Sequence, residues 1–312
     1  MQRLDARAAD FARQFDALVN ARREADADVS RDVAAIVARV KAEGDTAVAD
    51  YTQRFDGHDL PWQISPEECA AAYAALDAEL RAALDLAAAR IRTYHAKQKP
   101  VDSDSVDDSG VRLGARWRAV DAAGVYVPGG RAAYPSSVLM NAIPARVAGV
   151  ERLVMVTPTP KGEINPLVLA AAHIAGVDQV WRIGGAQAIA ALAFGTDTID
   201  RVDVITGPGN AWVAEAKRQL YGVVGIDMVA GPSEILVVAD GENNPAWIAA
   251  DLLSQAEHDP TSQSILITDD ANFAEAVAAE VETQLAALAT EATARASWDA
   301  NGAIILVGDL MD

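Results

Sequence analysis

From residue 112 onward the chain alternates short β-branched runs with alanine-rich runs, and this alternation constrains its fold most strongly. Continuous apolar strands that alternate with helices predict parallel sheets covered on both faces. Because eight strands with glycine-rich crossings are many for one sheet, we expect an α/β protein with two sheets. The expected strands lie near 112–120, 124–127, 152–156, 178–183, 202–205, 234–239, 263–268 and 302–308, and the expected helices lie near 137–149, 166–176, 185–194, 210–221, 245–258 and 271–297.

The first hundred residues have helical periodicity instead. Ser30 is expected to cap a helix that runs to about Phe55, because serine is a favoured N-cap residue. The run Ser65-Pro66-Glu67-Glu68 predicts the start of further helix to about Lys97, in one piece or two. The acidic, serine-rich stretch 100–111 predicts a surface loop. We therefore expect an N-terminal helical segment ahead of the sheets.

Composition limits the partners and the compartment. The net charge of −19 argues against nucleic acid, whose phosphates would be repelled. No apolar run approaches the roughly 20 residues of a membrane helix, and the charged N-terminus lacks an apolar signal core. The single cysteine, Cys69, lies in a helical pattern and suggests a structural thiol in a reducing compartment. We therefore expect a cytoplasmic protein that binds neither nucleic acid nor membrane.

Three glycine-rich turns each follow an expected strand and open an expected helix. They read GVYVPGG, RIGGAQA and ITGPGNAW, and they contain Tyr126, Gln187 and Asn210, the last as a helix cap. Free N–H groups at such helix starts suit an anionic ligand, and open α/β sheets bind ligands at the carboxyl ends of their strands. An ordinary βα turn explains each motif equally well when taken alone. The third is not a standard dinucleotide fingerprint, because Trp212 occupies the place of its third glycine.

The stretch DLLSQAEHDP ends an amphipathic helix with several donor side chains. Gln255 and His258 are three residues apart and share one helix face, where an amide oxygen and an imidazole suit a cation such as Zn²⁺. The alternative is that His258 merely complements the negative helix C-terminus. Two donors also fall short of the four that zinc prefers. In the upstream motif GPSE, Ser233 could donate to a substrate or satisfy the turn.

Taken together, these motifs resemble those of one enzyme family, the histidinol dehydrogenases. The similarity runs from near the first helix to the last residue and is densest over 117–269. Several long motifs in one order are far more specific than a lone glycine loop. In order, they read GVYVPGGRAAYPSSVLMNAIPARVAGV, GGAQAIAALAFGT, GPGNAWVAEAK, GIDMVAGPSEILVVAD and LLSQAEHDP.

This resemblance implies a zinc-dependent, NAD-linked homodimeric enzyme of the last step of histidine biosynthesis. Such an enzyme oxidises L-histidinol through L-histidinal to L-histidine and reduces two NAD⁺. By resemblance, the metal ligands are Gln255 and His258, which also meet the substrate; Ser233 contacts the substrate; and Tyr126, Gln187 and Asn210 line the dinucleotide site.

The resemblance also implies a division into two lobes with incomplete Rossmann-like, mostly parallel sheets. Residues 1–125 together with 234–312 are expected to form the first lobe, and 126–233 the second.

The chain departs from the family pattern at its C-terminus. Family members continue for about a hundred further residues, roughly one small domain. The family's Glu-His acid–base pair and its remaining metal ligands correspond to positions beyond Asp312, so we expect no catalytic acid–base residue within 1–312. The expected strand at 304–307 also lacks the covering helix that normally follows a parallel strand. We expect a truncated and impaired enzyme; the alternative is an inactive remnant that serves ligand binding or dimerisation.

Overall fold

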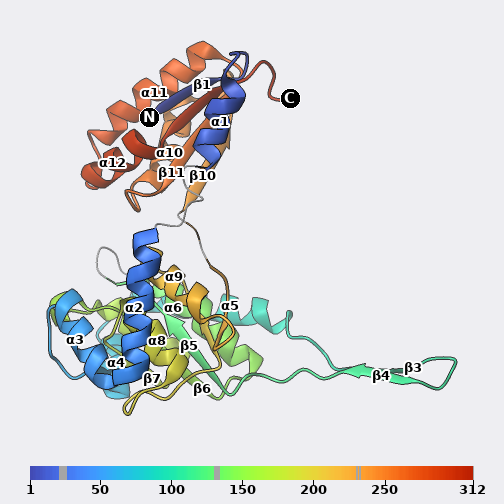
Figure 1. Cartoon of the computed structure of the whole chain (residues 1–312), viewed down its shortest axis with the longest axis vertical. Helices are drawn as coiled ribbons and strands as arrows, with labels where there is room; N and C mark the ends of the chain where they lie inside the picture. The colour runs from blue at the N-terminus through green and yellow to red at the C-terminus, as the bar shows by residue number, and fades with distance from the viewer. Residues whose placement is uncertain (21–26, 130–133, 230, 232, 312) are drawn as a thin grey trace. The chain divides into compact units, whose positions relative to one another are not determined.

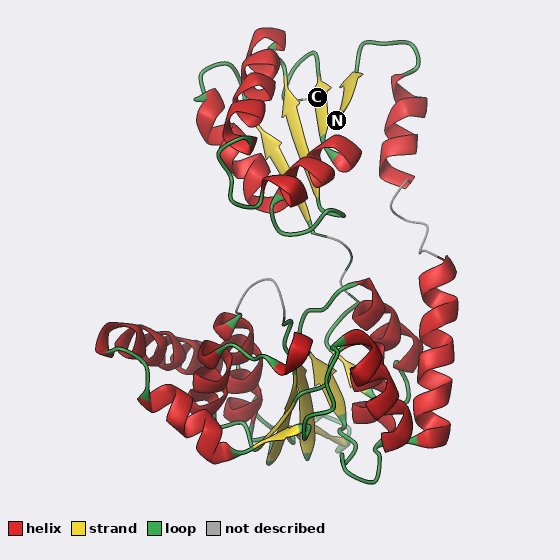
Figure 2. Ribbon diagram, turned by 90° about the vertical axis from the view of Figure 1, so that its left-hand side faces the viewer, coloured by secondary structure: helices red, strands yellow, loops and turns green. Residues whose placement is uncertain are grey.

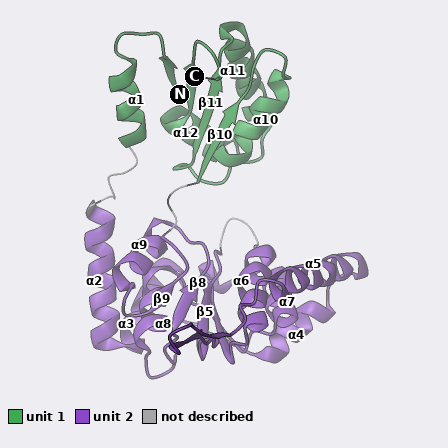
Figure 3. Ribbon diagram, turned by 90° about the vertical axis from the view of Figure 1, so that its right-hand side faces the viewer, with its two compact units in different colours: residues 1–26, 231–312 green, residues 27–230 purple. Residues whose placement is uncertain are grey.

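The computed structural model describes residues 1–20, 27–129, 134–229, 231 and 233–311. The chain divides into two compact units, which Figure 3 colours separately. The smaller unit comprises residues 1–26 and 231–312, and the larger unit comprises residues 27–230. Each unit contains a sheet of mostly parallel strands with helices packed on it, so the predicted α/β class is confirmed.

The units divide the chain differently from the expected lobes. The second boundary lies near residue 231, close to the expected 234, but residues 27–125 belong to the larger unit and not with 234–312. The reason is hydrophobic packing: Val33, Ile36 and Val40 are buried against the sheet of the larger unit. Expecting 1–125 to join the smaller unit as a whole was therefore wrong.

The larger unit is built on six described strands in the order β2-β7-β6-β5-β8-β9. All neighbours are parallel except β2 and β7. Its strands are β2 (Gln63–Ile64), β5 (Ala122–Tyr126), β6 (Arg152–Val156), β7 (Gln179–Trp181), β8 (Val204–Thr206) and β9 (Gly225–Ile226). Its helices are α2 (Ala27–Glu43), α3 (Asp45–Phe55), α4 (Pro66–Ala74), α5 (Ala78–Ala96), α6 (Pro135–Ala148), the 3-10 helix η1 (Pro160–Gly162), α7 (Pro166–Ala175), α8 (Gly185–Phe194) and α9 (Ala211–Leu220).

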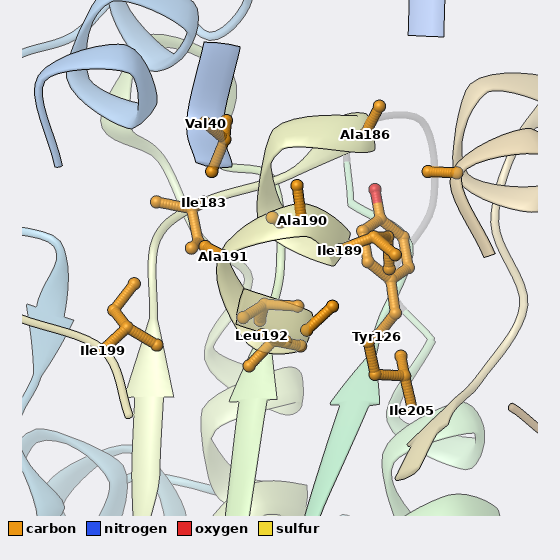
Figure 4. Close-up of a cluster of buried hydrophobic side chains, with 14 of the residues drawn as sticks. Val40, Tyr126, Ile183, Ala186, Ile189, Ala190, Ala191, Leu192, Ile199 and Ile205 are labelled. Carbon is orange, nitrogen blue, oxygen red and sulfur yellow. The ribbon is translucent and has the colours of Figure 1, made fainter. Parts of the chain in front are cut away.

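Two helix layers enclose this sheet (Figure 2). Helices α2, α3, α8 and α9 cover one face, and α4, α5, α6 and α7 cover the other (Figure 3). The first layer buries a cluster that includes Val40, Ile189, Leu192 and Ile205 (Figure 4). Strands such as β5 are buried along their whole length, which explains why they lack alternating polarity.

The smaller unit has four described strands in the order β1-β12-β11-β10, all parallel. Helices α10, α11 and α12 share one hydrophobic cluster with this sheet, while Leu18 of α1 packs with Leu4 and Ile305 in another. The elements are β1 (Gln2–Asp5), α1 (Phe11–Asn20), β10 (Glu234–Val238), α10 (Pro245–Ala256), β11 (Gln263–Thr268), α11 (Ala271–Leu285), α12 (Glu291–Asn301) and β12 (Ala303–Leu306).

The stretch expected as a loop at 100–111 and a strand at 112–120 forms a separate two-stranded ribbon. Strands β3 (Ser103–Val106) and β4 (Arg112–Ala115) pair antiparallel, and every residue in them is exposed. Figure 1 shows this ribbon extending away from the sheet of its own unit. The strand expected at 112–120 is present only as β4, which lies outside the parallel sheets, and the expected loop at 100–111 contains β3.

Several helix ends also test the sequence predictions. The Ser65 hydroxyl accepts from the backbone N–H of Glu68, and the Glu68 carboxylate accepts from the N–H of Ser65, so the predicted helix start is confirmed as a capping box. Ser30 is not a cap, because it lies inside α2; the helix breaks at Gly44, which has a φ of 55°. The helix expected at 271–297 is two helices, α11 and α12. No helix among the described residues is long and apolar enough to cross a bilayer.

Candidate functional site

The larger unit has a topological switch point between β5 and β8. From β5 the chain proceeds through β6 and β7 on one side, whereas β8 and β9 lie on the other. Because these strands are parallel, their carboxyl ends share one edge of the sheet. Ligands of open α/β sheets bind at such an edge, in the crevice beside the switch point.

A pocket of about 440 Å³ lies at this edge and unites the three predicted dinucleotide residues. Tyr126 ends β5, Gln187 lies in the first turn of α8 after β7, and Asn210 precedes α9 after β8. The remaining described lining residues are Ile36, Phe55, Asp56, Gly129, Pro158, Pro160, Gly184, Gly185, Ala186 and Trp212.

Tyr126 forms part of the pocket floor and is buried. Its ring belongs to the same hydrophobic cluster as Ile189 and Ile205 (Figure 4). Its hydroxyl oxygen accepts a hydrogen bond from the backbone N–H of Gly185 at 3.1 Å. Burial raises the pKa of Tyr126 to about 12. The side chain is therefore a neutral, fixed phenol that joins β5 to the start of α8.

Gln187 lines the pocket and has a buried polar atom without a hydrogen-bond partner in the part of the chain that the structure describes. The residue is 2% exposed, and its Oε1 atom has no hydrogen-bond partner among the described residues. A buried acceptor without a partner is costly, so such an atom calls for an explanation. A ligand that donates a hydrogen bond to Oε1 supplies one.

Asn210 caps α9, as the sequence predicted. Its Oδ1 atom accepts from the backbone N–H groups of Trp212 at 3.1 Å and Val213 at 3.2 Å. The cap occupies the side-chain oxygen, so the amide nitrogen remains available to donate to a ligand.

Two pocket residues from the end of α3 were not predicted from the sequence. Phe55 is 50% exposed and offers an aromatic surface, as does Trp212. Asp56 is buried, and its carboxylate accepts from the backbone N–H of Thr159 at 3.2 Å. Burial raises the pKa of Asp56. Neither residue belongs to a local motif, so only the tertiary structure places it beside Tyr126.

The candidate substrate and metal residues lie in the smaller unit. Ser233 directly precedes β10, and its carbonyl accepts from Gln263 at 3.0 Å. Gln255, near the end of α10, is half-buried, and its amide nitrogen lies 3.5 Å from the hydroxyl of Ser262. His258 follows that helix, and its side chain is exposed. All three therefore lie near the edge where β10 and β11 begin.

The described residues do not complete a metal site. Nowhere in the described ranges do three or more His, Cys, Asp or Glu side chains group in a way that could hold a metal ion. Gln255 and His258 offer one amide oxygen and one imidazole, whereas zinc takes four ligands. These two residues alone do not fit a zinc centre.

The resemblance predicts that the family's acid–base pair has no counterpart within residues 1–312. The resemblance assigns that pair to positions beyond Asp312, and Asp312 itself lies outside the described residues. The last described element, β12, ends at Leu306, and only residues 307–311 follow it in the structure. The absence of a catalytic acid–base residue within 1–312 therefore stays a prediction, which a measurement of activity can test.

Cys69 does not line the pocket that contains Tyr126. It is buried in α4, and burial raises the pKa of its thiol to about 11. The thiolate is therefore scarce at neutral pH, as expected of a structural cysteine.

Comparison with known proteins identifies the family. The family model described as histidinol dehydrogenase matches residues 19–312. The chain is 63% identical over 311 residues to the histidinol dehydrogenase of Zymomonas mobilis, a match that covers 99% of this chain and 72% of that protein. The chain belongs to the histidinol dehydrogenase family. The predicted resemblance is thus confirmed.

Two further histidinol dehydrogenases support the same family assignment. That of Ruegeria pomeroyi is 62% identical over 312 residues, covering 99% of this chain and 72% of that protein. The crystal structure of histidinol dehydrogenase from Elizabethkingia anophelis superposes with a TM-score of 0.85 at 36% identity, covering 99% of this chain and 71% of that one. The chain therefore spans about seven-tenths of the length of these family members.

Proposed function

We propose that the chain carries out histidinol dehydrogenase chemistry: the NAD-dependent oxidation of L-histidinol through L-histidinal to L-histidine, the last step of histidine biosynthesis. Membership of the family supports this proposal. The observation that carries it is the convergence of Tyr126, Gln187 and Asn210 on one pocket at the carboxyl edge of a parallel sheet. The bound NAD⁺ would supply the hydride acceptor, and the protein would supply placement.

The pocket residues can hold a dinucleotide in complementary ways. Gln187 offers a buried acceptor through Oε1, and Asn210 offers a donor through its amide nitrogen. Phe55 and Trp212 add aromatic surfaces against which a planar ring can pack. Tyr126 holds the start of α8 and does not exchange protons near neutral pH, so its role is positioning.

We propose Ser233, Gln255 and His258 as the substrate-binding set. A serine hydroxyl, an amide and an imidazole can all hydrogen-bond an amino alcohol. The family's zinc stays a proposal, which the described residues support with two donors only, Gln255 and His258.

A second candidate function is dinucleotide binding without turnover. This function is favoured by a difference between the proposed nucleotide residues and the proposed metal ligands. The three nucleotide residues line one pocket, whereas the described residues supply fewer metal ligands than zinc needs. No adjacent Glu-His pair follows residue 258 in the 312-residue sequence.

One pair of experiments separates the two functions. Formation of NADH would be followed by absorbance with the 312-residue chain, L-histidinol, NAD⁺ and Zn²⁺, and binding of NAD⁺ would be followed by calorimetry. A histidinol-dependent, chelator-sensitive rate supports the enzyme. Binding without any rate, beside an active longer family member, supports the second function. Failure to bind and to react refutes both.

The same proposal includes a homodimer and a cytoplasmic location, each with its own test. Analytical ultracentrifugation would report the mass of the chain in solution, and a monomer at micromolar concentration would contradict the dimer. Fractionation of cells that produce the protein would test the compartment.

A further inference from the structure

The nucleotide turn Gly207-Pro208-Gly209-Asn210 is bound by an ion pair between Lys217, which is buried, and Asp227, whose side chain is 31% exposed. Lys217 of α9 keeps only 4% of its side chain exposed, and its Nζ atom forms an ion pair with the Asp227 carboxylate. The same Nζ donates a hydrogen bond to the Gly207 carbonyl at 3.0 Å. The Asp227 carboxylate in turn accepts from the Gly207 N–H at 2.8 Å. Both polar groups of Gly207 are therefore bound by one ion pair.

The turn needs such support because its conformation is unusual. Gly207 has a φ of 111°, and its backbone lies so close to Tyr126 that an added Cβ would overlap the Tyr126 carbonyl oxygen. Neither local propensity nor a side chain of its own fixes Gly207 in this place. The ion pair supplies the missing restraint through charge-assisted hydrogen bonds, which are stronger than neutral ones.

Lys217 lies outside the lining of the nucleotide pocket. Its ammonium group is engaged by the Asp227 carboxylate and the Gly207 carbonyl. Asp227 also accepts from the backbone N–H of Met228 at 2.7 Å, which fixes the carboxylate. Because neither residue lines the pocket, we infer that the pair acts on a dinucleotide through the turn.

We propose that Lys217 and Asp227 are positioning residues for dinucleotide binding: by holding both backbone groups of Gly207, they fix the turn that places Asn210 at the pocket. This inference rests on the proposed NAD site. Lys217 and Asp227 lie in the motifs GPGNAWVAEAK and GIDMVAGPSEILVVAD, but the resemblance assigns neither a role. The pair is distinct from the predicted ligands Tyr126, Gln187 and Asn210.

A matched control lies on the same helix. Glu215 is buried and pairs with Arg218, and the neighbouring Gln219 amide donates to the Ser30 carbonyl of α2 at 2.9 Å. This second pair lies within α9, contacts Ser30 of α2 through Arg218, and makes no hydrogen bond to the turn. The variant Glu215→Gln/Arg218→Met therefore perturbs the helix but leaves Gly207 bound.

The experiment measures NAD⁺ affinity by calorimetry and stability by thermal unfolding for four variants. In Lys217→Met, the Kd for NAD⁺ should rise about 10-fold or more, and in Lys217→Arg, which keeps the charge, about 3-fold or less. The double variant Lys217→Met/Asp227→Leu leaves no uncompensated charge, so it should recover thermal stability while its affinity stays low. The control Glu215→Gln/Arg218→Met should keep the wild-type Kd. A double variant that recovers both stability and affinity would overturn the proposal.

Hydrogen–deuterium exchange at the Gly207 amide makes the test independent of NAD binding. Exchange should accelerate in Lys217→Met and in the double variant but not in the control. If the wild-type chain fails to bind NAD⁺, the proposed function is refuted, and exchange alone decides whether the pair restrains the turn. Unchanged protection of Gly207 in both Lys217→Met and the double variant would overturn the inference.

Discussion

The hydroxyl oxygen of Tyr126 accepts a hydrogen bond from the backbone N–H of Gly185 at 3.1 Å. This contact joins the last residue of β5 to the first residue of α8, across 59 residues of sequence. It connects two of the three glycine-rich motifs and places Gln187 two residues further on. The pocket is therefore assembled by a bond that neither motif reveals alone.

The raised pKa of Tyr126 predicts that the protein loses stability at high pH. This pKa is raised from 10 in the unfolded chain to about 12 in the fold, mainly by burial. Because the folded state holds the phenol proton more tightly than the unfolded state, the contribution of Tyr126 to the free energy of unfolding is complete below pH 10. As the pH rises from 10 through 12, this contribution is lost, and the free energy of unfolding falls by about 2–3 kcal/mol. Tyr126→Phe should cost about 1–3 kcal/mol near neutral pH, because the Gly185 N–H loses its acceptor.

Urea unfolding of both proteins at several pH values tests this prediction. The stability difference between wild type and Tyr126→Phe should narrow between pH 10 and 12, since only the wild type titrates at this position. Parallel stability curves over that range would show that the phenol does not titrate as proposed.

Asn210→Ala should separate capping from ligand binding. Loss of the cap should lower the free energy of unfolding by about 1 kcal/mol. Asn165 caps α7 in the same manner, accepting from Leu167 at 2.9 Å, but does not line the pocket. Asn165→Ala should therefore lose similar stability and keep the wild-type Kd for NAD⁺, whereas Asn210→Ala should bind NAD⁺ about 10-fold more weakly. Equal affinities of the two variants would remove Asn210 from the site.

Gly207→Ala should be among the most damaging small substitutions in the larger unit. It combines a φ of 111° with overlap between the new Cβ and the Tyr126 carbonyl. We expect a loss of about 2–5 kcal/mol in the free energy of unfolding. Gly222 also has a positive φ, 98°, but nothing lies within 4 Å of its added Cβ. Gly222→Ala should lower the free energy of unfolding by about 1–2 kcal/mol, because only its positive φ, and no steric overlap, opposes the new side chain. Similar losses in denaturant unfolding of both variants would argue against close packing at Gly207.

Zinc should contribute little to the stability of this 312-residue chain. Gln255 and His258 provide two donors, and the described residues contain no larger group of metal-binding side chains. Removal of metal with a chelator should therefore leave the thermal midpoint unchanged within error, and equilibrium dialysis should show weak zinc binding. His258→Ala should change the free energy of unfolding by less than about 0.5 kcal/mol, because the side chain is exposed. A chelator-induced fall of several degrees would contradict this prediction and point to further donors.

Local sequence signals predicted the framework of the pocket. An asparagine ahead of a helical run predicted the cap at Asn210, and this prediction is confirmed. A pair of glycines ahead of an alanine-rich run predicted that Gln187 lies in the first turn of a helix, and this is confirmed as well. The buried strands were found because parallel strands covered on both faces are continuously apolar.

Long-range packing was beyond those signals. Asp56 reaches the pocket only because α3 packs against α8, and the Lys217–Asp227 pair depends on the pairing of β9 with β8. Strand β1 has one buried residue, Leu4, so its sequence lacks the apolar run that would predict a strand paired with β12. Every residue of the β3–β4 ribbon is exposed, so its short sequences SDSV and RLGA carry no burial pattern that would distinguish it from a loop.

The central claim is that the larger unit binds NAD⁺ at the pocket lined by Tyr126, Gln187 and Asn210. Calorimetric titration of the folded 312-residue chain with NAD⁺ tests it most directly, beside Gln187→Ala, which removes the unpartnered acceptor. The account predicts saturable binding with one site per chain and an affinity about 10-fold weaker in Gln187→Ala. Absence of binding to the folded wild-type chain, or equal affinity in the variant, would contradict it.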